Sequence, residues 1–484
     1  MAEGEGQTLI EMKMRIGGQW VDAADGSTME VLDPARGTVI AVVPKGGEAD
    51  VDRAVAAARE GLERWMAVNP EDRAKIMWRI AEKIHEHADH LAELESKQTG
   101  SPGQQWTMHG VAARRFEYYA GLADKQFGRT LDLAGGKWSY TRTEPLGVTA
   151  HIVPWNGPMW SGTRSIAPAL AAGCSVVVKP AGEAPLTLLE LARLAEEECG
   201  LPPGVINVVT GTGTGAGAAL TRHPGIDGIW FTGGAVAGRA VQLAAAENHK
   251  PVVLELGGKS PNIVFEDADI EAAVQGALWG IFLNAGQICV AGSRLLVQRS
   301  IHDEFVEKLA QLAKALRLGP PESQPDLGPM ISEGHRQTVL EYIAKGKEEA
   351  QLVVGGGVPQ DEELAAGYYV EPTIFCNVRP EAVIAQEEIF GPVLAVTPFD
   401  TEEEAVAIAN GTKYGLAAGV WTQNLARAHR VAAKLEAGQV YINHYYGSIE
   451  MSRSAYKESG YGVSEGVDAL QAFVRTKAVT VQLG

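Results

Sequence analysis

The stretch from Ser175 to Gly211, SVVVKPAGEAPLTLLELARLAEEECGLPPGVINVVTG, decides the fold. It opens with a short β-branched run, Ser175 to Val178, and closes with a second one, Val205 to Val209. Between them, Leu186 to Glu198 carries leucine and alanine at the spacing of an amphipathic helix, and Gly200 follows as a helix stop. A strand, a helix and a strand in this order predict two parallel strands with a helix packed across them.

The same alternation continues on both sides of this unit. Gly147 to Val153 and Gly228 to Phe231 are further apolar, strand-like runs. After Gly258 the pattern begins again, with a strand at Asn262 to Phe265, a helix from Ile270 and a strand at Arg294 to Gln298. Strands that alternate with helices predict an α/β protein with parallel sheets covered on both faces. A single hydrophobic core does not extend over 484 residues, so we expect two such doubly wound domains.

Two extended segments fit neither domain. Gly128 to Pro145 resembles a hairpin that turns at Gly135-Gly136, and the tail Ala478 to Leu483 is a second extended piece. Exposed edge strands pair readily with another chain, so the two segments can form an arm that contacts a second subunit. A solvated hairpin and a frayed end remain the alternative.

Composition places the chain among ordinary globular proteins. Hydrophobic residues make up 45% and charged residues 21%, and no apolar run reaches the roughly 18 residues that cross a bilayer. The first residues, Met1 to Gln7, are acidic and small, unlike a secretory signal with a basic start and an apolar centre. We therefore expect a cytoplasmic protein with no membrane partner.

Net charge and cysteine usage argue against three further classes of protein: nucleic-acid-binding, disulfide-stabilised and metal-binding proteins. The formal net charge is −18, from 42 Lys+Arg against 60 Asp+Glu, so nucleic acid is not an expected partner. Four cysteines, Cys174, Cys199, Cys289 and Cys376, are scattered, with no CxxC pair and no nearby histidine cluster. This pattern predicts neither a disulfide framework nor a metal site, and it leaves room for one reactive thiol.

Two glycine-rich turns are candidates for a phosphate-binding loop. Gly211, Gly213 and Ala216 match the G-x-G-x-x-A form of a dinucleotide fingerprint, but the following acid, Asp227, comes too early. The run Trp230 to Gly234 is better placed, since a threonine hydroxyl and bare backbone N–H groups precede a helix there. A plain tight turn is the alternative for either segment.

Four short segments narrow the function. They are Pro154-Trp155-Asn156, Glu255 to Pro261 (ELGGKSP), Gly286 to Arg294 (GQICVAGSR) and Glu387 to Pro392 (EEIFGP). In order and spacing the chain resembles the aldehyde dehydrogenase superfamily from about Ile16 to Val481, and Cys289 lies 34 residues after Glu255, as in that family.

The chemistry of the residues agrees with that resemblance. An aldehyde carbonyl can lose hydride only after a nucleophile has converted it to a tetrahedral adduct, and a thiolate is the side chain best suited to form one. Cys289 has small neighbours, Gly286, Ala291 and Gly292, which leave room for a substrate and a cofactor ring. The other three cysteines are interpreted as structural.

The resemblance implies a role for three catalytic residues. Asn156 corresponds to the amide that stabilises the oxyanion, Cys289 to the nucleophile, and Glu255 to the general base for hydrolysis. The expected reaction is oxidation of an aldehyde to a carboxylic acid with NAD(P), through a thiohemiacetal and a thioester on Cys289. Family members that acylate coenzyme A lack the glutamate, so Glu255 favours hydrolysis; a non-catalytic structural relative is a third hypothesis, which retention of all three residues disfavours.

The resemblance also implies the cofactor site. Lys179 corresponds to the lysine at the adenosine ribose, Glu388 to the glutamate at the nicotinamide ribose, and Phe390 to the ring beside the nicotinamide. Assigned with them are the remaining cofactor residues, Trp155, Thr232, Gly233 and Gly234. Gly182 stands where many members have a glutamate that repels a 2′-phosphate, so both NAD and NADP are expected, with NAD slightly favoured.

The resemblance to the family also implies domain boundaries. Residues 1–127 and 146–257 are expected to form a Rossmann-like dinucleotide-binding domain, and residues 258–463 the catalytic domain. Residues 128–145 and 464–484 would form an oligomerisation arm and tail. The expected partners are a small-molecule aldehyde and further copies of the chain, as a homodimer or a homotetramer.

The substrate pocket is predicted to surround Cys289. Its expected residues are Trp160, Arg164, Leu283, Ile288, Val290, Tyr445, Tyr446 and Arg453. Trp160 and Arg164 lie one helical turn apart on one face, and Gly162 to Ala167 resembles the salicylaldehyde and vanillin dehydrogenase branch. Arg164 matches a carboxylate-binding arginine of semialdehyde dehydrogenases, or it pairs with a structural carboxylate. A polar aromatic aldehyde, a semialdehyde and a broad aldehyde range all remain open.

The C-terminal region departs from the family. Arg453 to Lys457 replaces the usual glycine-rich stretch, and Ser464 stands where a glutamate often lies near the water path, with Glu465 next to it. These departures weaken the case for a proton relay through this region, but they leave Glu255 in place.

Overall fold

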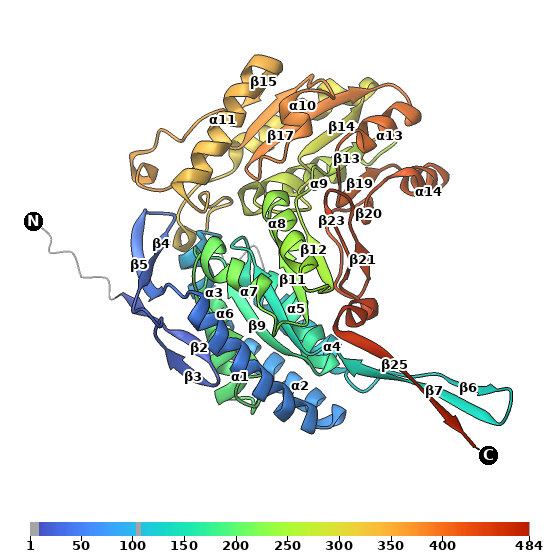
Figure 1. Cartoon of the computed structure of the whole chain (residues 1–484). Coiled ribbons are helices and arrows are strands. Elements are labelled where there is room, and N and C mark those ends of the chain that lie inside the picture. The colour runs from blue at the N-terminus through green and yellow to red at the C-terminus, as the bar shows by residue number, and fades with distance from the viewer. Residues whose placement is uncertain (1–8, 103–107, 484) are drawn as a thin grey trace, which may run out of the picture.

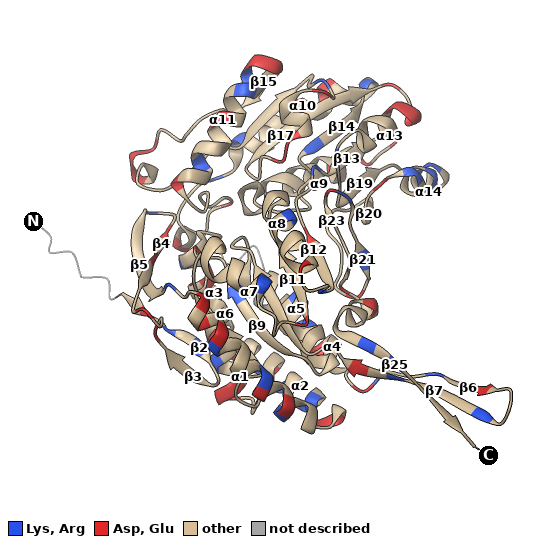
Figure 2. Cartoon of the chain, in the orientation of Figure 1, with Lys and Arg blue, Asp and Glu red and all other residues tan. Residues whose placement is uncertain are grey.

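The computed structural model of the chain describes residues 9–102 and 108–483. Two α/β domains lie one above the other, and a narrow β-arm projects from the lower one (Figure 1). Lys and Arg are interspersed with Asp and Glu over the outer helices in the view of Figure 2. No described helix is long and apolar enough to cross a membrane.

Five parallel strands form the centre of the lower sheet, in the order β10-β9-β8-β11-β12. Antiparallel strands β2, β3 and β23 extend its two edges. This order places the topological switch point between β8 and β11, where sheets of this class bind their ligands. The strands are β2 (Met14–Ile16), β3 (Gln19–Val21), β8 (Val148–Val153), β9 (Ser175–Pro180), β10 (Ile206–Val208), β11 (Gly228–Thr232), β12 (Val252–Glu255) and β23 (Gly460–Tyr461).

Helices cover both faces of this sheet, which explains the unbroken β-branched run in β9. Val176 and Val178 are buried in the core on one face, while Val177 is buried in the core on the other. A strand that is covered on both sides needs apolar residues at every position rather than at alternate ones. The helices of this domain are α1 (Glu48–Ala67), α2 (Pro70–Glu86), α3 (Ala88–Thr99), α4 (Met108–Ala120), α5 (Pro158–Ala172), α6 (Leu186–Glu197), α7 (Ala218–Arg222) and α8 (Ala235–Ala246).

The upper sheet has six parallel strands in the order β16-β17-β14-β13-β19-β20, with β15 antiparallel at one edge. Its strands are β13 (Pro261–Val264), β14 (Arg294–Gln298), β15 (Gln351–Val354), β16 (Thr373–Cys376), β17 (Val393–Phe399), β19 (Ala417–Trp421) and β20 (Gln439–Ile442). Its main helices are α9 (Ile270–Phe282), α10 (His302–Ala315), α11 (Glu333–Glu349), α13 (Glu402–Asn410) and α14 (Leu425–Lys434). The predicted α/β class with two doubly wound sheets is confirmed.

Smaller sheets complete the fold. N-terminal strands form a three-stranded sheet of β1 (Ile10–Glu11), β5 (Thr38–Pro44) and β4 (Thr28–Asp33). Near the C-terminus two short pairs join β18 (Tyr414–Gly415) with β22 (Tyr456–Lys457), and β21 (Arg453–Ser454) with β24 (Val463–Ser464).

The arm is a three-stranded sheet made within one chain. A hairpin of β6 (Thr130–Leu133) and β7 (Lys137–Pro145) turns at Gly135 and Gly136, which both have positive φ. The C-terminal strand β25 (Val474–Gln482) pairs antiparallel with β7 along its whole length, so the tail is not a frayed end. The outer edges of this narrow sheet stay exposed at the far end of the arm (Figure 1).

One segment lies outside the domain in which the sequence placed it. Strand β23 falls within residues 258–463, expected to be catalytic, yet it pairs with β12 in the lower sheet. Gly460 makes this pairing possible: its φ is +121°, and a Cβ there would collide with the backbone of Leu254. Sequence spacing cannot reveal such a return of the chain, because it depends on a glycine in a short irregular segment.

Candidate active site

The candidate site lies where the two sheets face each other. The lower sheet contributes the carboxyl ends of its strands: Asn156 follows β8, Thr232 ends β11 and Glu255 ends β12. The upper sheet contributes loops that precede its strands, with Cys289 before β14 and Glu388 before β17. A cavity with about 730 Å³ of empty space lies between them, lined by Pro154, Trp155, Asn156, Trp160, Ser161, Arg164, Thr232, Gly233, Gly234, Glu255, Leu256, Gly257, Cys289, Glu388 and Phe390.

The loop that carries Cys289 is held in an unusual backbone conformation. Asn284, Ala285 and Gly286 have φ of 50°, 52° and 74°, and a Cβ on Gly286 would collide with the carbonyl of Gly391. The Gln287 side chain fixes the loop: its amide donates to the Asn284 and Pro329 carbonyls at 3.2 and 3.1 Å, and its oxygen accepts from Ile331 N–H at 3.0 Å. Residues in this region are strained unless their surroundings hold them, as happens here.

Cys289 is a free thiol that reaches the cavity, whereas Cys174, Cys199 and Cys376 are buried. Burial raises the pKa of the Cys289 thiol. The charges of Arg164 and Arg453 act against this rise, and the carboxyls of Glu255 and Glu388 add to it.

Asn156 is connected directly to the cysteine loop. Its side-chain amide donates to the Gln287 carbonyl at 2.9 Å, and the Asn284 amide donates to the Asn156 carbonyl at 3.3 Å. A carboxamide has two N–H donors, so one hydrogen of Asn156 remains for an oxygen in the cavity. The first bond therefore fixes the orientation of the second donor in a cavity that Cys289 also lines.

Glu255 is buried and lies close to a cation. The Nη1 atom of Arg164 is 3.8 Å from Oε2 of Glu255, and Nη2 of Arg164 donates to the Thr232 hydroxyl at 3.1 Å. Arg164 thus lies between the ends of β11 and β12, with its guanidinium carbon 5.3 Å from the Trp160 ring centroid.

Glu388 and Phe390 line the cavity from the upper sheet. The Glu388 carboxylate accepts from the Gly258 N–H at 3.0 Å, and burial raises the pKa of Glu388 to about 7. Phe390 has a φ of 59°, and its ring meets the Trp155 ring edge-on at 5.4 Å. His335 contacts the Phe390 carbonyl through Nε2 at 2.7 Å, which helps to hold this strained residue.

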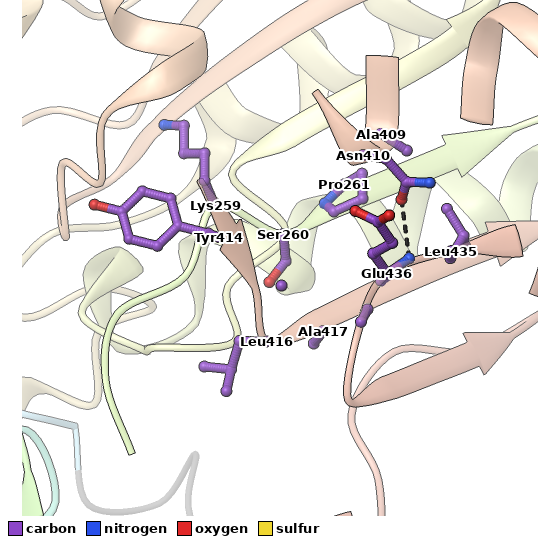
Figure 3. Close-up of a pocket in the computed structure, with 13 residues that line it drawn as sticks. Lys259, Ser260, Pro261, Ala409, Asn410, Tyr414, Leu416, Ala417, Leu435 and Glu436 are labelled. Atoms are coloured by element: carbon purple, nitrogen blue, oxygen red, sulfur yellow. Dashed lines mark hydrogen bonds between the residues drawn. The ribbon is translucent and has the colours of Figure 1, made fainter. Parts of the chain in front are cut away.

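Lys259, two residues after the cavity-lining Gly257, is a buried cation. Burial lowers the pKa of its ammonium group to about 7, against the charges of Glu388 and Glu387. Its Nζ has no hydrogen-bond acceptor in the described part of the chain. Figure 3 shows the ammonium turned toward the Tyr414 side and away from Asn410 and Glu436. Its interaction with Glu388 is through charge.

The proposed phosphate-facing turn connects β11 to α8. Thr232, Gly233 and Gly234 line the cavity, and a Cβ built on Gly234 would meet no atom within 4 Å. Lys179 lies near the end of β9, with β8 between it and β11, and its Nζ donates to the Pro180 carbonyl at 2.7 Å, while burial lowers its pKa to about 8. The other glycine loop, at Gly213–Gly217, forms a single π-helical turn.

The cavity brings together some of the predicted pocket residues. Trp160 and Arg164 line it. Two tyrosines pack behind the cysteine loop: Tyr445 donates to the Val290 carbonyl at 2.9 Å and Tyr446 to the Trp279 carbonyl at 3.2 Å. Within the described ranges the cavity lining does not include Leu283, Ile288, Val290, Tyr445, Tyr446 or Arg453.

Sequence reasoning missed a buried ion cluster behind Trp160. Arg115 on α4 and Arg453 on β21 both contact Glu465, whose side chain is 1% exposed. Arg115 and Glu465 are 350 residues apart, so no local pattern could have paired them. Ser161, Leu256 and Gly257 also line the cavity, and the last two belong to the ELGGKSP segment.

Comparisons with known proteins agree with this geometry. A sequence model of the aldehyde dehydrogenase family matches residues 20–479. "Aldehyde dehydrogenase 1" of Tanacetum cinerariifolium is 45% identical over 97% of this chain and 95% of its own. Two solved structures superpose with a TM-score of 0.95 over 98% of this chain: an aldehyde dehydrogenase of Bacillus cereus with NAD+ (42% identity, 97% of that chain) and a betaine aldehyde dehydrogenase of Staphylococcus aureus with NAD+ (39%, 95%).

The family match covers nearly the whole chain, as the resemblance of the four segments predicted. The relative and both structures align along almost their full lengths, so the likeness extends to the arm as well as to both domains. The chain belongs to the aldehyde dehydrogenase family.

Proposed function

We propose that this chain oxidises an aldehyde to a carboxylic acid with NAD or NADP, through covalent catalysis at Cys289. The observation that carries the proposal is the cavity itself, which joins a thiol, a carboxamide and a carboxylate from three separate segments of the chain. Each group has the chemistry that one step of the reaction requires.

The first step is attack of the Cys289 thiolate on the aldehyde carbon. The carbonyl oxygen then becomes an oxyanion in a thiohemiacetal, and the second N–H of the Asn156 amide is available to it. Removal of a single donor of this kind typically costs about 3–4 kcal/mol of transition-state stabilisation. The bond from Asn156 to the Gln287 carbonyl holds the amide ready before the substrate arrives.

The cofactor fits the other end of the cavity. Thr232, Gly233 and Gly234 offer an open backbone turn at the start of α8, which suits a pyrophosphate. Lys179 and Glu388 would hold the two riboses, and Trp155 and Phe390 would pack near the ring. When bound, the nicotinamide would supply the hydride acceptor for oxidation of the thiohemiacetal to a thioester on Cys289.

Hydrolysis of the thioester needs a base. Glu255 lines the same cavity as Cys289, where it can take a proton from the water that attacks the acyl carbon. Acyl transfer to coenzyme A would not need this carboxylate, so the hydrolytic route is favoured. A non-catalytic relative would not need the three groups in one cavity.

Two variants test these roles. Cys289→Ala should abolish aldehyde-dependent reduction of the cofactor while cofactor binding stays within a few-fold of the wild type. Glu255→Gln should still give one reduced cofactor per site in a burst, followed by slow turnover, because only deacylation is impaired. Cys376→Ala, a change at a buried cysteine away from the cavity, serves as the matched control. Normal turnover of Cys289→Ala would disprove the proposal.

The assembly and the substrate belong to the same proposal. The arm formed by residues 128–145 and 464–484 is proposed to join subunits in a homodimer or homotetramer. The tail of the aldehyde is proposed to lie toward Trp160 and Arg164, with the remaining predicted pocket residues around it. A polar aromatic aldehyde or a semialdehyde fits an aromatic ring beside a guanidinium group.

A further inference from the structure

A buried carboxyl group on α3 meets the starts of two other helices. The side chain of Glu95 accepts from the Thr187 hydroxyl at 2.6 Å and from the Met159 backbone N–H at 3.4 Å. Thr187 is the second residue of α6, and Met159 is the second residue of α5. The N–H groups in the first turn of a helix have no acceptor within the helix, and that end attracts negative charge. A carboxylate therefore suits the place that Glu95 occupies.

A second side chain of α3 fixes this carboxyl group. Gln98, one turn after Glu95, donates from its amide to the Thr187 hydroxyl at 2.9 Å, and its oxygen accepts from the Leu186 N–H at 2.8 Å. Glu95 and Gln98 are both buried. The Thr187 hydroxyl thus receives a hydrogen bond from Gln98 and donates its own to Oε2 of Glu95. The other oxygen, Oε1, is the one that faces Met159 at the start of α5.

Packing alone does not account for an ionisable group at this position. Burial raises the pKa of the Glu95 carboxyl to about 7, and the hydrogen bonds from Thr187, Met159 and Gln98 act against this rise. All three donors are neutral, so they offset only part of the cost of removing a carboxylate from water. An apolar side chain could fill the same space without that cost. What it could not do is accept from the first turn of α5.

The first turn of α5 leads directly to the cavity. Asn156 lies two residues before Pro158, the first residue of α5, and Asn156 and Ser161 both line the cavity. The N-cap residue between them is Gly157, which has no side chain to accept from the N–H groups of the turn. Its backbone carbonyl accepts from the Ser161 N–H at 2.7 Å. Glu95 therefore supplies, from another helix, the acceptor that a capping side chain supplies elsewhere.

We propose that Glu95 is a positioning residue for the oxyanion donor: it fixes the first turn of α5 and, through that turn, the side-chain amide of Asn156. The amide is then held from two directions, by the turn that follows Asn156 and by the Gln287 carbonyl, which accepts one of its hydrogens at 2.9 Å. Precise placement matters because a displacement of about 1 Å can cost two orders of magnitude in rate. This inference rests on the proposed oxidation of aldehydes at Cys289.

Removal of the acceptor tests the positioning role. Glu95→Met keeps a side chain of similar length but leaves the Met159 N–H without its acceptor, so kcat for benzaldehyde should fall roughly tenfold to a hundredfold. Glu95→Gln keeps an oxygen that can accept from the same N–H, and its kcat should stay within about threefold of the wild type. KM for NAD should change by less than about threefold in both variants, because no residue assigned to the cofactor lies on α5.

A double-mutant cycle with Asn156 separates positioning from support of the fold. Asn156→Ala removes the donor itself and should lower kcat roughly a hundredfold to a thousandfold. If Glu95 acts through the Asn156 amide, adding Glu95→Met to Asn156→Ala should lower kcat by less than about threefold more. Losses that multiply would show that Glu95 supports the fold independently of Asn156, and they would overturn the proposal.

Two further variants complete the experiment. Glu93→Gln changes an exposed glutamate of α3 that pairs with Lys97, and it should leave kcat unchanged. Glu95→Asp covers the case in which Glu95→Met does not fold: it keeps the charge but withdraws the carboxylate from an N–H that is already 3.4 Å away, so kcat should fall here too. A wild-type kcat in Glu95→Asp would overturn the positioning role alone. A wild type that oxidised neither benzaldehyde nor hexanal would overturn the proposed function as well.

Discussion

At the scale of single residues, the position of Cys289 is set by the backbone that precedes it. The loop before it is held with three successive positive φ angles, and Gln287 anchors that loop from below. The same residue offers its carbonyl to Asn156, so the nucleophile and the proposed oxyanion donor share one support. A change at Gln287 would therefore disturb both groups together.

The raised pKa of the Cys289 thiol leads to a prediction about how its alkylation depends on pH. Because burial raises that pKa above the ordinary value of 9.0, the thiolate fraction at neutral pH is small and grows as pH rises. The rate of inactivation by iodoacetamide should increase with pH and show no plateau below about pH 9. Mass spectrometry of the modified chain assigns the site. A plateau near pH 7 would mean that the surrounding cations outweigh burial.

Cofactor choice gives a second prediction. Gly182 lies beyond the end of β9, close to Met29, whose methyl group would be 2.7 Å from an added Cβ and can move aside. Gly182→Glu should place a carboxylate near the adenosine ribose and repel a 2′-phosphate, so the ratio of kcat/KM for NAD over NADP should rise by about tenfold or more. Gly182→Gln has a similar size without the charge and is the control. An unchanged ratio would place Gly182 away from the ribose.

Sequence reasoning could find residues whose chemistry is local to a segment. Asn156, Glu255 and Cys289 each lie in a quoted segment, and all three line one cavity. It could not find the pairing of Arg115 with Glu465. Charged residues are usually exposed, and the sequence gives no reason to expect two of them, 350 positions apart, to be buried together.

At the scale of helices and strands, the spacing of apolar residues and the residues that end a helix predicted the central elements well. The helix expected at Leu186 to Glu198 is observed at Leu186–Glu197, and the strand expected at Arg294 to Gln298 has those bounds. Two-residue strands such as β23 were not foreseen, since so short a run has no period. The turns that follow β8 and β11 are short because the helix must begin at the sheet edge, and this places Asn156 and Thr232 at the switch point.

The arm carries a prediction at this scale. Leu131 and Leu133 on β6 lie on the same face of the strand, with exposed fractions of 63% and 38%. If the arm joins subunits, replacing both by Asp should lower the mass seen by light scattering at micromolar concentration, because charge would be buried at the contact. Leu425→Asp, at a 73% exposed leucine on α14, is the matched control. An unchanged mass would remove this face of the arm from the interface.

At the scale of the whole molecule, the site exists because two sheets meet with opposite polarity. The lower sheet presents the carboxyl ends of its parallel strands, and the upper sheet presents the loops before its own. Neither domain alone holds Cys289 together with Asn156 and Glu255. Alternation in the sequence predicted both sheets, but their relative placement depends on contacts between distant segments and could come only from the family resemblance.

This arrangement has a thermodynamic consequence for cofactor binding. The residues proposed to hold the cofactor come from both domains, Thr232 and Gly234 from the lower one and Glu388 and Phe390 from the upper one. A ligand that binds only when both are folded and docked stabilises the native state by about 2.7 kcal/mol at a concentration of 100 Kd. The unfolding temperature should therefore rise with NAD or NADP concentration.

Cys289→Ala provides the decisive version of this measurement. It removes turnover but none of the proposed cofactor contacts, so its thermal shift with cofactor should match that of the wild type. Glu388→Gln should reduce the shift, because Glu388 contacts the Gly258 backbone and, in the proposal, the nicotinamide ribose. Glu387→Gln, a change at the neighbouring acid that pairs with Lys413 outside the cavity, should leave the shift intact. If neither dinucleotide raised the unfolding temperature at millimolar concentration, the cavity between the sheets would not be the cofactor site.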